Sequence, residues 1–203
     1  MCGILGGSGD FNALGLKSGL EAIGHRGPDD SGLYIDGAAR IALGHARLAI
    51  LDLSPAGHQP MVSDDGQLVL VFNGEIYNFR ELRATLEAKG VAFRGHSDTE
   101  VLLRLYQAEG LAILPLLNGI FAFALYDKRG GDLLVVRDAL GVKPFYVSEG
   151  DGHFVFSSEI KGMLPLLRSE RELDEEALLR YLTYLWCPGD GTPLACVRKL
   201  GPG

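Results

Sequence analysis

Two patterns of apolar residues alternate along this chain. Stretches in which apolar residues recur every three or four positions predict helices, and stretches that are apolar at almost every position predict strands covered on both faces. The predicted helices lie at 12–23, from 78 onward, from 97 onward, at 111–117, at 158–167 and at 174–185. The predicted strands lie at 4–5, 32–35, 40–45, 67–72, 119–127, 132–138, 143–147 and 153–158, and the stretch 47–53 is expected to stay extended as far as Pro55.

Polar residues between these stretches predict how the elements begin and connect. The sequence KRGG (128–131) separates two apolar arms and predicts a hairpin, and SEGDG (148–152) predicts a second one. Asn78 and Ser97 each stand three residues before a glutamate, Glu81 and Glu100. This spacing predicts a capping box at the start of each helix, in which the two side chains bond each other's backbone N–H groups.

The order of elements is a series of antiparallel hairpins with helices inserted between them, which is typical of the α+β class. Because the strands are apolar on both faces, we expect two mainly antiparallel sheets packed face to face, each covered on its outside by helices. The stretch from about 186 to 203 is rich in Gly and Pro and holds no predicted closing element. We therefore expect it to lead toward a further domain.

Composition narrows the class of protein. Of the 203 residues 47% are hydrophobic and 22% are charged, with a formal net charge of −7, a profile typical of soluble globular proteins. No cluster of Lys and Arg resembles a surface for nucleic acid or membranes, so we expect neither partner. No apolar run reaches the roughly 20 residues that cross a bilayer. The three cysteines show neither zinc spacing nor a disulfide framework, which predicts no metal site and a cytoplasmic location.

The second residue, Cys2, is the strongest candidate for chemistry. Removal of Met1 would leave Cys2 with a free α-amine, whose pKa of about 7.7–8.0 lets it accept a proton near neutral pH. The thiol, with a pKa of about 8.5, lies in the same residue. One residue would then hold a nucleophile and its general base. The alternative is a small buried residue that only packs.

Five further residues could complete a site around such a nucleophile. Asn73 and Gly74 follow an apolar strand, where an amide and a free N–H could form an oxyanion hole; a plain Asn-Gly turn is the alternative. Arg47 stands in an otherwise apolar stretch and needs an anion, either a substrate carboxylate or a structural salt-bridge partner. Glu75 and Asp98 lie near two capping segments. One arginine and two acids together match a free α-amino acid.

Eight segments, taken in order, resemble one known family: the glutamine-hydrolysing N-terminal domain of asparagine synthetases, a class II glutamine amidotransferase. The segments are MCGILG (1–6), HRGPD (25–29), RLAILD (47–52), NGEIYN (73–78), SDTE (97–100), NGIFAFALYD (118–127), RDALGVKPFY (137–146) and SSEIK (157–161). The tail GTPLACVRKLGPG (191–203) resembles the family's lead into its synthetase domain.

The resemblance implies a glutamine amidotransferase domain over residues 1–203 with the four-layer αββα sandwich of N-terminal-nucleophile hydrolases. It implies that L-glutamine is the substrate and that Cys2 is the nucleophile once Met1 is removed. By position, Asn73 and the Gly74 N–H would stabilise the oxyanion.

The same resemblance assigns the residues that hold the substrate. Arg47 would hold the glutamine α-carboxylate, and Glu75 and Asp98 would hold its ammonium group. Backbone from Leu48 to Ile50 would line the pocket.

The resemblance also implies partners outside this domain. The ammonia would serve the chain's own C-terminal synthetase domain, where ATP and Mg²⁺ would support the conversion of aspartate to asparagine. The domain described by this sequence would need no cofactor. A homodimer is a further arrangement that the resemblance allows. Some relatives aminate surface polysaccharide or antibiotic precursors, so the acceptor stays open.

Two alternatives from other classes also stay open. One is a non-catalytic scaffold that has kept the fold, and the other is an N-terminal-cysteine acylase that acts on a different amide. The segment HRGPD is expected to be structural, with Arg26 in a local ion pair. His45 and the remaining histidines show no metal spacing and are expected to be ordinary residues.

Overall fold

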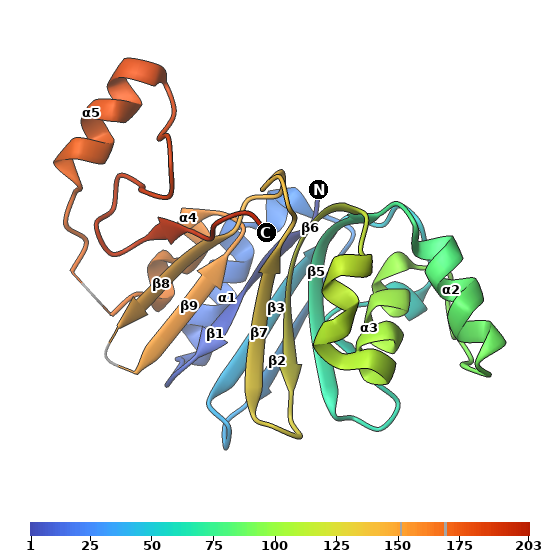
Figure 1. Cartoon of the computed structure of the whole chain (residues 1–203). Helices are drawn as coiled ribbons and strands as arrows, with labels where there is room; N and C mark the ends of the chain where they lie inside the picture. The colour runs from blue at the N-terminus through green and yellow to red at the C-terminus, as the bar shows by residue number, and fades with distance from the viewer. Residues whose placement is uncertain (151, 169) are drawn as a thin grey trace.

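Two antiparallel sheets lie face to face in the computed structural model, which describes residues 1–150, 152–168 and 170–203 (Figure 1). Within these residues the larger sheet has the strand order β10 (Arg198–Lys199), β8 (Tyr146–Gly150), β9 (His153–Ser157), β1 (Gly3–Ser8), β3 (Ile41–Arg47), β2 (Asp30–Asp36). The smaller sheet has the order β4 (Met61–Val62), β5 (Leu68–Ile76), β6 (Gly119–Asp127), β7 (Asp132–Arg137). The predicted α+β class with two antiparallel sheets is confirmed.

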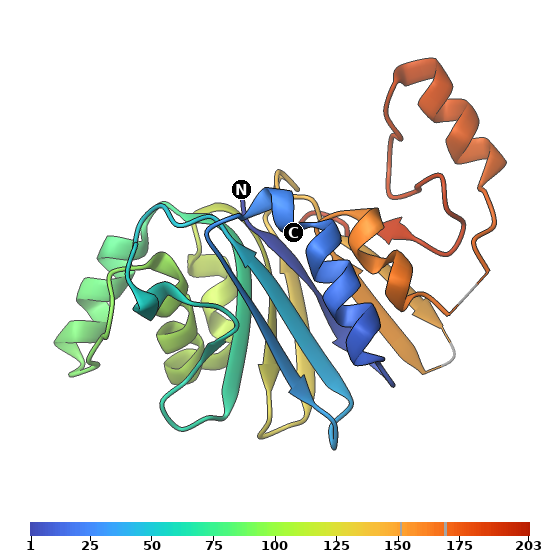
Figure 2. The same ribbon diagram turned by 180° about the vertical axis from the view of Figure 1, so that it is seen from behind.

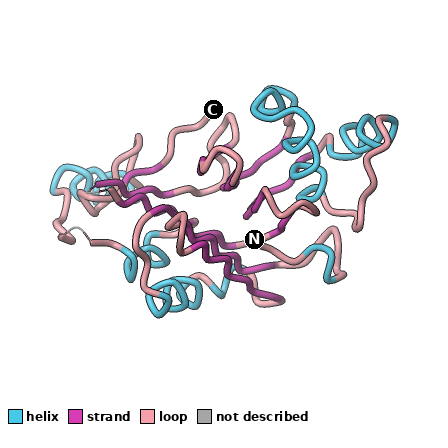
Figure 3. Tube along the Cα trace, turned by 90° about the horizontal axis from the view of Figure 1, so that it is seen from below, coloured by secondary structure: helices cyan, strands magenta, loops and turns pink. Residues whose placement is uncertain are grey.

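Helices cover the outer faces of both sheets. The helices α1 (Ala13–Ala22) and α4 (Ile160–Met163) lie on the larger sheet, which Figure 2 shows from behind. On the other side, α3 (Asp98–Glu109) lies on the smaller sheet, and α2 (Phe79–Ala88) packs against α3 (Figure 1). In the view from below, the sheets form the inner layers and these helices the outer ones (Figure 3). The expected four-layer αββα sandwich is therefore confirmed, with α5 (Glu175–Tyr184) standing away from it (Figure 1).

The buried core follows these layers. Ile4, Leu43 and Val71 belong to one cluster between the sheets, where β1, β3 and β5 meet. The neighbouring residue Leu70 instead joins Leu102 of α3 in the cluster under the outer helices. Because successive side chains of a strand point to opposite faces, the first part of β5, Leu68–Phe72, is apolar at every position and fills both clusters. This explains the continuous apolar run that predicted the strand.

Polar contacts set the start of α3 and only partly match the predicted capping box. Ser97 caps the helix as predicted, because its hydroxyl accepts from the Glu100 N–H at 3.2 Å. Glu100 does not return a bond to Ser97. Its carboxylate accepts from the N–H groups of Arg94, at 2.9 Å, and Gly95, at 2.8 Å, and so shapes the segment that leads into the helix.

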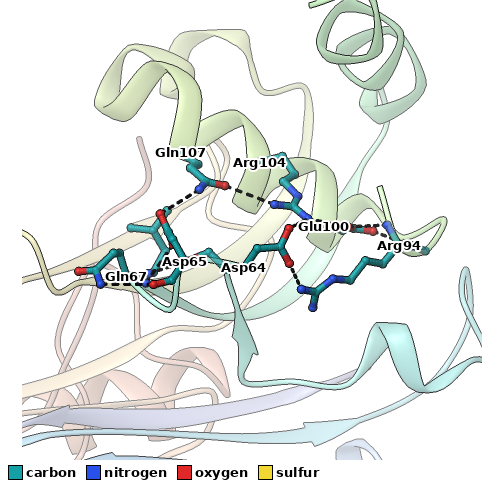
Figure 4. A network of polar contacts seen from close by, with 10 residues as sticks. Asp64, Asp65, Gln67, Arg94, Glu100, Arg104 and Gln107 are labelled. Carbon is teal, nitrogen blue, oxygen red and sulfur yellow. Dashed lines mark hydrogen bonds and ion pairs between the residues drawn. The ribbon is translucent and has the colours of Figure 1, made fainter. Parts of the chain in front are cut away.

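The turn between β4 and β5 is tied to α3 by a network of charged and amide side chains (Figure 4). The Asp64 carboxylate pairs with the guanidinium groups of Arg94 and Arg104. Next to it, the Gln107 amide donates to the Asp65 carboxylate at 3.1 Å. These contacts join the smaller sheet to the helix whose first turn carries Asp98.

At the second predicted capping box, Asn78 directly precedes α2, but its side chain forms no hydrogen bond that caps the helix. Its amide instead donates to the Leu116 carbonyl at 2.9 Å, and its side-chain oxygen accepts from the Asn118 N–H at 3.0 Å. The capping prediction at Asn78 is therefore wrong, because the side chain joins α2 to the loop before β6.

Several boundaries differ from those that the pattern predicts. β3 ends at Arg47, so the stretch 47–53 is a loop rather than an extended continuation, and a short 3-10 helix follows at Pro55–Gly57. The predicted helix at 158–167 divides into α4 and a 3-10 helix at Leu164–Leu166. Further 3-10 helices lie at Gly24–Arg26 and Gly110–Leu116. The predicted hairpin turn at 148–152 includes residue 151, which lies outside the described residues.

Among the residues that the structure describes, no helix has both the length and the apolar character needed to cross a membrane.

Candidate active site

The candidate site lies where the layer between the two sheets opens to the surface. Cys2 directly precedes β1, and Arg47 is the last residue of β3, whose Ala46 pairs with Gly3 of β1. The ends of β1 and β3 therefore place these two side chains together. They border a cavity of about 160 Å³. The cavity is lined by every predicted site residue: Cys2, Arg47, Leu48, Ile50, Asn73, Gly74, Glu75 and Asp98.

The Cys2 thiol rests against the backbone of Leu48. Its sulfur lies 3.7 Å from the Leu48 carbonyl oxygen, to which it donates, and 3.4 Å from the Leu48 nitrogen, from which it accepts. Burial raises the pKa of the Cys2 thiol above its usual value, while the bond from Leu48 lowers it. The thiol is thus protonated at neutral pH, and a nucleophilic role requires a base to remove its proton.

The backbone of Cys2 is held by Arg26 from the HRGPD segment. The Arg26 Nε donates to the Cys2 carbonyl at 2.9 Å, and its Nη1 donates to Glu159 at 2.8 Å. Arg26 therefore forms an ion pair as predicted, but its partner Glu159 lies 133 residues away in the sequence rather than in the same loop. The contact with Cys2 was not predicted, because it joins loops that only the fold brings together.

Asn73 and Gly74 lie within β5 rather than after its end, so that part of the prediction is wrong. The Asn73 side chain points into the layer between the sheets, on the same face as Val71. Its amide nitrogen is buried and has no hydrogen-bond partner among the described residues. Gly74 is required by packing, because a Cβ there would collide with the Ile120 carbonyl oxygen of β6. A free buried donor beside a thiol is the arrangement that an oxyanion hole needs.

Arg47 lines the cavity from the end of β3. Its guanidinium donates to the carbonyl oxygens of Asp52 and Ser54 (3.2 Å for Ser54), so the loop after β3 folds around it. No carboxylate of the described chain pairs with Arg47, so the structural salt bridge considered as an alternative is not found there. A Cβ at Gly57 would collide with the guanidinium, so glycine is needed for this close approach.

Asp98 lies in the first turn of α3 and is buried, with only 5% of its surface exposed. Its carboxylate accepts from the Ile76 N–H at 3.0 Å and the Thr99 N–H at 2.8 Å. Burial raises the pKa of Asp98 to about 6, and the nearby Glu75 adds to the rise. Asp98 is therefore mainly ionised at pH 7. Glu75 lies exposed at the margin of the cavity.

Asp52 links the two sides of the cavity, a role that sequence reasoning missed. One carboxylate oxygen accepts from the Ser54 N–H at 2.8 Å, and the other accepts from the His96 N–H at 2.9 Å. The loop around Arg47 is thereby joined to the segment before Asp98. The only signal in the sequence was the presence of Asp52 in the segment RLAILD.

Within the described residues no group of His, Cys, Asp and Glu side chains is arranged to hold a metal ion.

The chain belongs to the glutamine amidotransferase family. Residues 1–203, the whole sequence, match the profile of the family described as "Glutamine amidotransferase domain". The family that the eight segments resemble is thereby confirmed.

Curated relatives place the chain more finely. It is 38% identical over 188 residues to asparagine synthetase [glutamine-hydrolyzing] 1 of Bacillus subtilis, covering 93% of this chain and 29% of that protein. It is 44% identical over 170 residues to asparagine synthetase [glutamine-hydrolyzing] 1 of Arabidopsis thaliana, covering 80% of this chain and 28% of that protein. Amidase chry2 of Gibberella zeae is 38% identical over 149 residues, covering 73% of this chain and 22% of that protein. The chain thus spans about a third or less of the length of these relatives.

A solved structure shares the fold. The glutamine phosphoribosylpyrophosphate amidotransferase of B. subtilis, in complex with ADP and GMP, superposes with a TM-score of 0.70 at 25% identity. The match covers 85% of this chain and 45% of that one. The similarity supports the two-sheet α+β sandwich architecture.

Proposed function

We propose that this domain hydrolyses L-glutamine to glutamate and ammonia through a thioester on Cys2. The observation that carries the proposal is the free, buried Asn73 amide at the cavity that also holds the Cys2 thiol. Arg47 and Asp98 supply opposite charges around the same cavity, as an amino-acid substrate requires.

In the first half of the reaction, the Cys2 α-amine, free after removal of Met1, takes the thiol proton. The sulfur forms a bond to the side-chain carbonyl carbon of glutamine, and the carbonyl electrons move to oxygen. The Asn73 amide and the Gly74 N–H donate to that oxyanion. The intermediate then collapses: its C–N bond breaks, the α-ammonium returns the proton to the leaving nitrogen, and ammonia departs from a thioester.

In the second half, water attacks the thioester carbon while the α-amine takes a proton from the water. The C–S bond breaks, the sulfur regains its proton, and glutamate leaves. The raised pKa of the Cys2 thiol is consistent with a mechanism in which the proton is removed only during attack.

The charged ends of glutamine provide its specificity. Arg47 holds the α-carboxylate, using guanidinium donors that its two backbone contacts leave free. Asp98 and Glu75 hold the ammonium group, and the backbone from Leu48 to Ile50 forms the wall of the pocket. Hydrogen bonds to charged groups contribute about 1.5–3 kcal/mol each, which favours glutamine over amides that lack these groups.

We further propose that the ammonia serves a C-terminal synthetase domain of the same protein, which uses ATP and Mg²⁺ to convert aspartate to asparagine. The names and greater lengths of the relatives support this acceptor. The similarity to an amidase favours one alternative, a family member with a different acceptor. This domain itself would act without a cofactor. A cytoplasmic location and a homodimer belong to the same proposal.

The test is a comparison of amides with protein whose loss of Met1 is verified by intact mass. We expect glutamate and ammonia to form in equal amounts from glutamine, with kcat/KM at least about 10-fold above that for asparagine or for the α-N-acetyl and α-amide derivatives of glutamine, since each derivative loses one charged contact. Chain that retains Met1 serves as the inert control, because its Cys2 nitrogen is an amide. Equal cleavage of the uncharged derivatives would instead support a general acylase, and no cleavage at all would support a scaffold.

A further inference from the structure

The strand that carries the oxyanion donors has a free edge at the site. β6 pairs with β5 along its whole length, whereas β4 pairs with it only through Met61–Leu70 and Val62–Val69. Backbone N–H groups of alternate residues in a strand point to the same side. Beyond Leu70, the N–H groups of Phe72, Gly74 and Ile76 therefore point away from β6 and have no neighbouring strand.

Side chains occupy this edge on both sides of Gly74. At Phe72, the N–H donates to the Gln59 side-chain oxygen at 2.7 Å, and the carbonyl lies 3.1 Å from His45 Nε2. At Ile76, the N–H donates to Asp98. The Gly74 N–H lies between these two anchored points and faces the cavity that Gly74 lines.

Among the described residues, the Phe72 carbonyl is the one polar partner of the buried His45 side chain. It lies in β3, two residues before Arg47, and none of its surface is exposed. Because the Phe72 carbonyl can only accept, Nε2 carries the proton, and Nδ1 has no partner within the described chain. Burial lowers the pKa of His45 to about 4, so the ring is neutral at pH 7. Burying a polar imidazole in an apolar layer costs free energy unless the ring is hydrogen-bonded. The bond from Nε2 to the Phe72 carbonyl is therefore the contact that needs an explanation.

Gln59 is similarly buried, with 5% of its surface exposed. Its amide nitrogen lies 3.4 Å from the Thr99 hydroxyl, next to Asp98 in α3. Gln59 therefore connects β5 to α3, the helix that presents the Asp98 carboxylate, while His45 connects β5 to β3, the strand that presents Arg47.

We propose that His45 and Gln59 are positioning residues, which hold the Phe72 backbone and thereby set where the Asn73 amide and the Gly74 N–H meet the oxyanion. The Phe72 carbonyl and the Asn73 nitrogen belong to one planar peptide group, so a rotation of that group moves Asn73 directly. The inference rests on the proposed glutaminase function, since it assigns the two side chains to that reaction.

The test compares two replacements of His45 that have the same length. In His45→Gln the amide nitrogen lies near the former Nε2 and can still donate, whereas His45→Met fills the space without a donor. We expect His45→Met to lower kcat for glutamine by about 10–100-fold with KM changed less than about threefold, since removal of an oxyanion donor itself costs about 100–1000-fold. His45→Gln should recover most of the loss.

A second readout separates positioning from general damage. A glutamine analogue with an aldehyde in place of the carboxamide adds the Cys2 sulfur to its carbonyl carbon, and the thiol proton ends on oxygen in a tetrahedral adduct. Its inhibition constant should rise in His45→Met by the same factor by which kcat falls. The dissociation constant of glutamate, which forms no such adduct, should stay within about twofold of wild type.

His153 provides a matched control. It is also a buried histidine whose Nε2 bonds a backbone carbonyl, that of Leu166 at 3.0 Å, and whose Nδ1 is unpartnered among the described residues. It lies in β9, bonds to the 3-10 helix at Leu164–Leu166 and does not line the cavity. His153→Met should leave kcat and the aldehyde affinity unchanged even where it lowers the melting temperature.

The outcomes separate the two proposals. If wild type releases no glutamate from glutamine, the proposed function fails. If wild type is active and His45→Met keeps kcat within twofold, or weakens glutamate binding as much as aldehyde binding, the positioning role is wrong. If His45→Met fails to fold, two variants of Gln59 decide the question. Gln59→Met removes the oxygen that accepts from the Phe72 N–H and should lower kcat at least tenfold. Gln59→Glu keeps an accepting oxygen there and should recover activity.

Discussion

At the scale of single residues, the buried carboxylate of Asp98 connects pH to substrate binding. Burial raises its pKa to about 6. In the proposed binding mode, the charged form of Asp98 is the partner of the substrate ammonium group. Protonation as the pH falls through 6 therefore removes a contact. This differs from an exposed aspartate, which would stay ionised at pH 5.

We expect the KM for glutamine to rise about tenfold between pH 7 and pH 5, because only about one Asp98 in eleven is ionised one unit below its pKa. Steady-state kinetics across this range measure the effect. The control is Asp98→Asn, whose KM should be high and independent of pH. A wild-type KM that stays flat from pH 7 to 5 would contradict the role of Asp98.

At the scale of elements, the site depends on how the loop after β3 is fastened to the start of α3. Asp52 holds the His96 N–H with one oxygen and the Ser54 N–H with the other. The carbonyl oxygens of Asp52 and Ser54 in turn fix the Arg47 guanidinium. The loop thus links the position of α3 to that of Arg47, the residue that we propose holds the substrate carboxylate.

We expect Asp52→Asn to raise the KM for glutamine about 5–20-fold with kcat changed less than about threefold, since the new amide group faces an N–H donor and loses a charged hydrogen bond worth about 1.5–3 kcal/mol. Asp65→Asn is the matched control: Asp65 also accepts from the N–H two residues onward, that of Gln67 at 3.0 Å, but lies in the turn after β4, in the network of Figure 4. A fall in kcat without a change in KM would contradict the assignment of Asp52 to substrate binding.

At the scale of the whole molecule, the proposed function makes the sandwich one half of a two-part reaction. The chain spans between 22% and 36% of the length of the matched asparagine synthetases of M. jannaschii, B. subtilis and A. thaliana. The proposed glutaminase therefore generates ammonia that another part of the full-length protein would consume.

In the full-length protein, we expect Cys2→Ala to reduce glutamine-dependent asparagine formation by at least about 1000-fold, because the nucleophile is lost. Synthesis from added ammonium salts should stay within about twofold of wild type, since that route bypasses the thioester. Product analysis with glutamine or ammonium as the nitrogen source measures both. Cys196→Ala, a change in a thiol that does not line the cavity, should affect neither. Loss of the ammonium-dependent reaction in Cys2→Ala would mean that the two sites are not separable.

The sequence predicted the elements well where one local pattern decides the outcome. The apolar run Leu68–Phe72, which fills two core clusters, predicts β5. The sequence pattern does not predict that the strand continues to Ile76. Asn73 and Glu75 are polar because they face the cavity and solvent, not because the strand ends. The predicted cap at Asn78 is wrong for a related reason. Its side-chain amide bonds the backbone of Leu116 and Asn118, which are distant in the sequence, and a local capping pattern cannot show this.

The sequence by itself determined the layered α+β architecture and the chemistry available at Cys2, because periodicity dictates which faces are buried and a cysteine after Met1 brings its own base. Only the tertiary structure decided which atoms meet: Arg26 with the Cys2 carbonyl, Asp52 with His96, and His45 with Phe72. Hydrogen bonds depend on distance and direction within tenths of an ångström. Residues far apart in the chain reach such geometry only through the stacking of the two sheets.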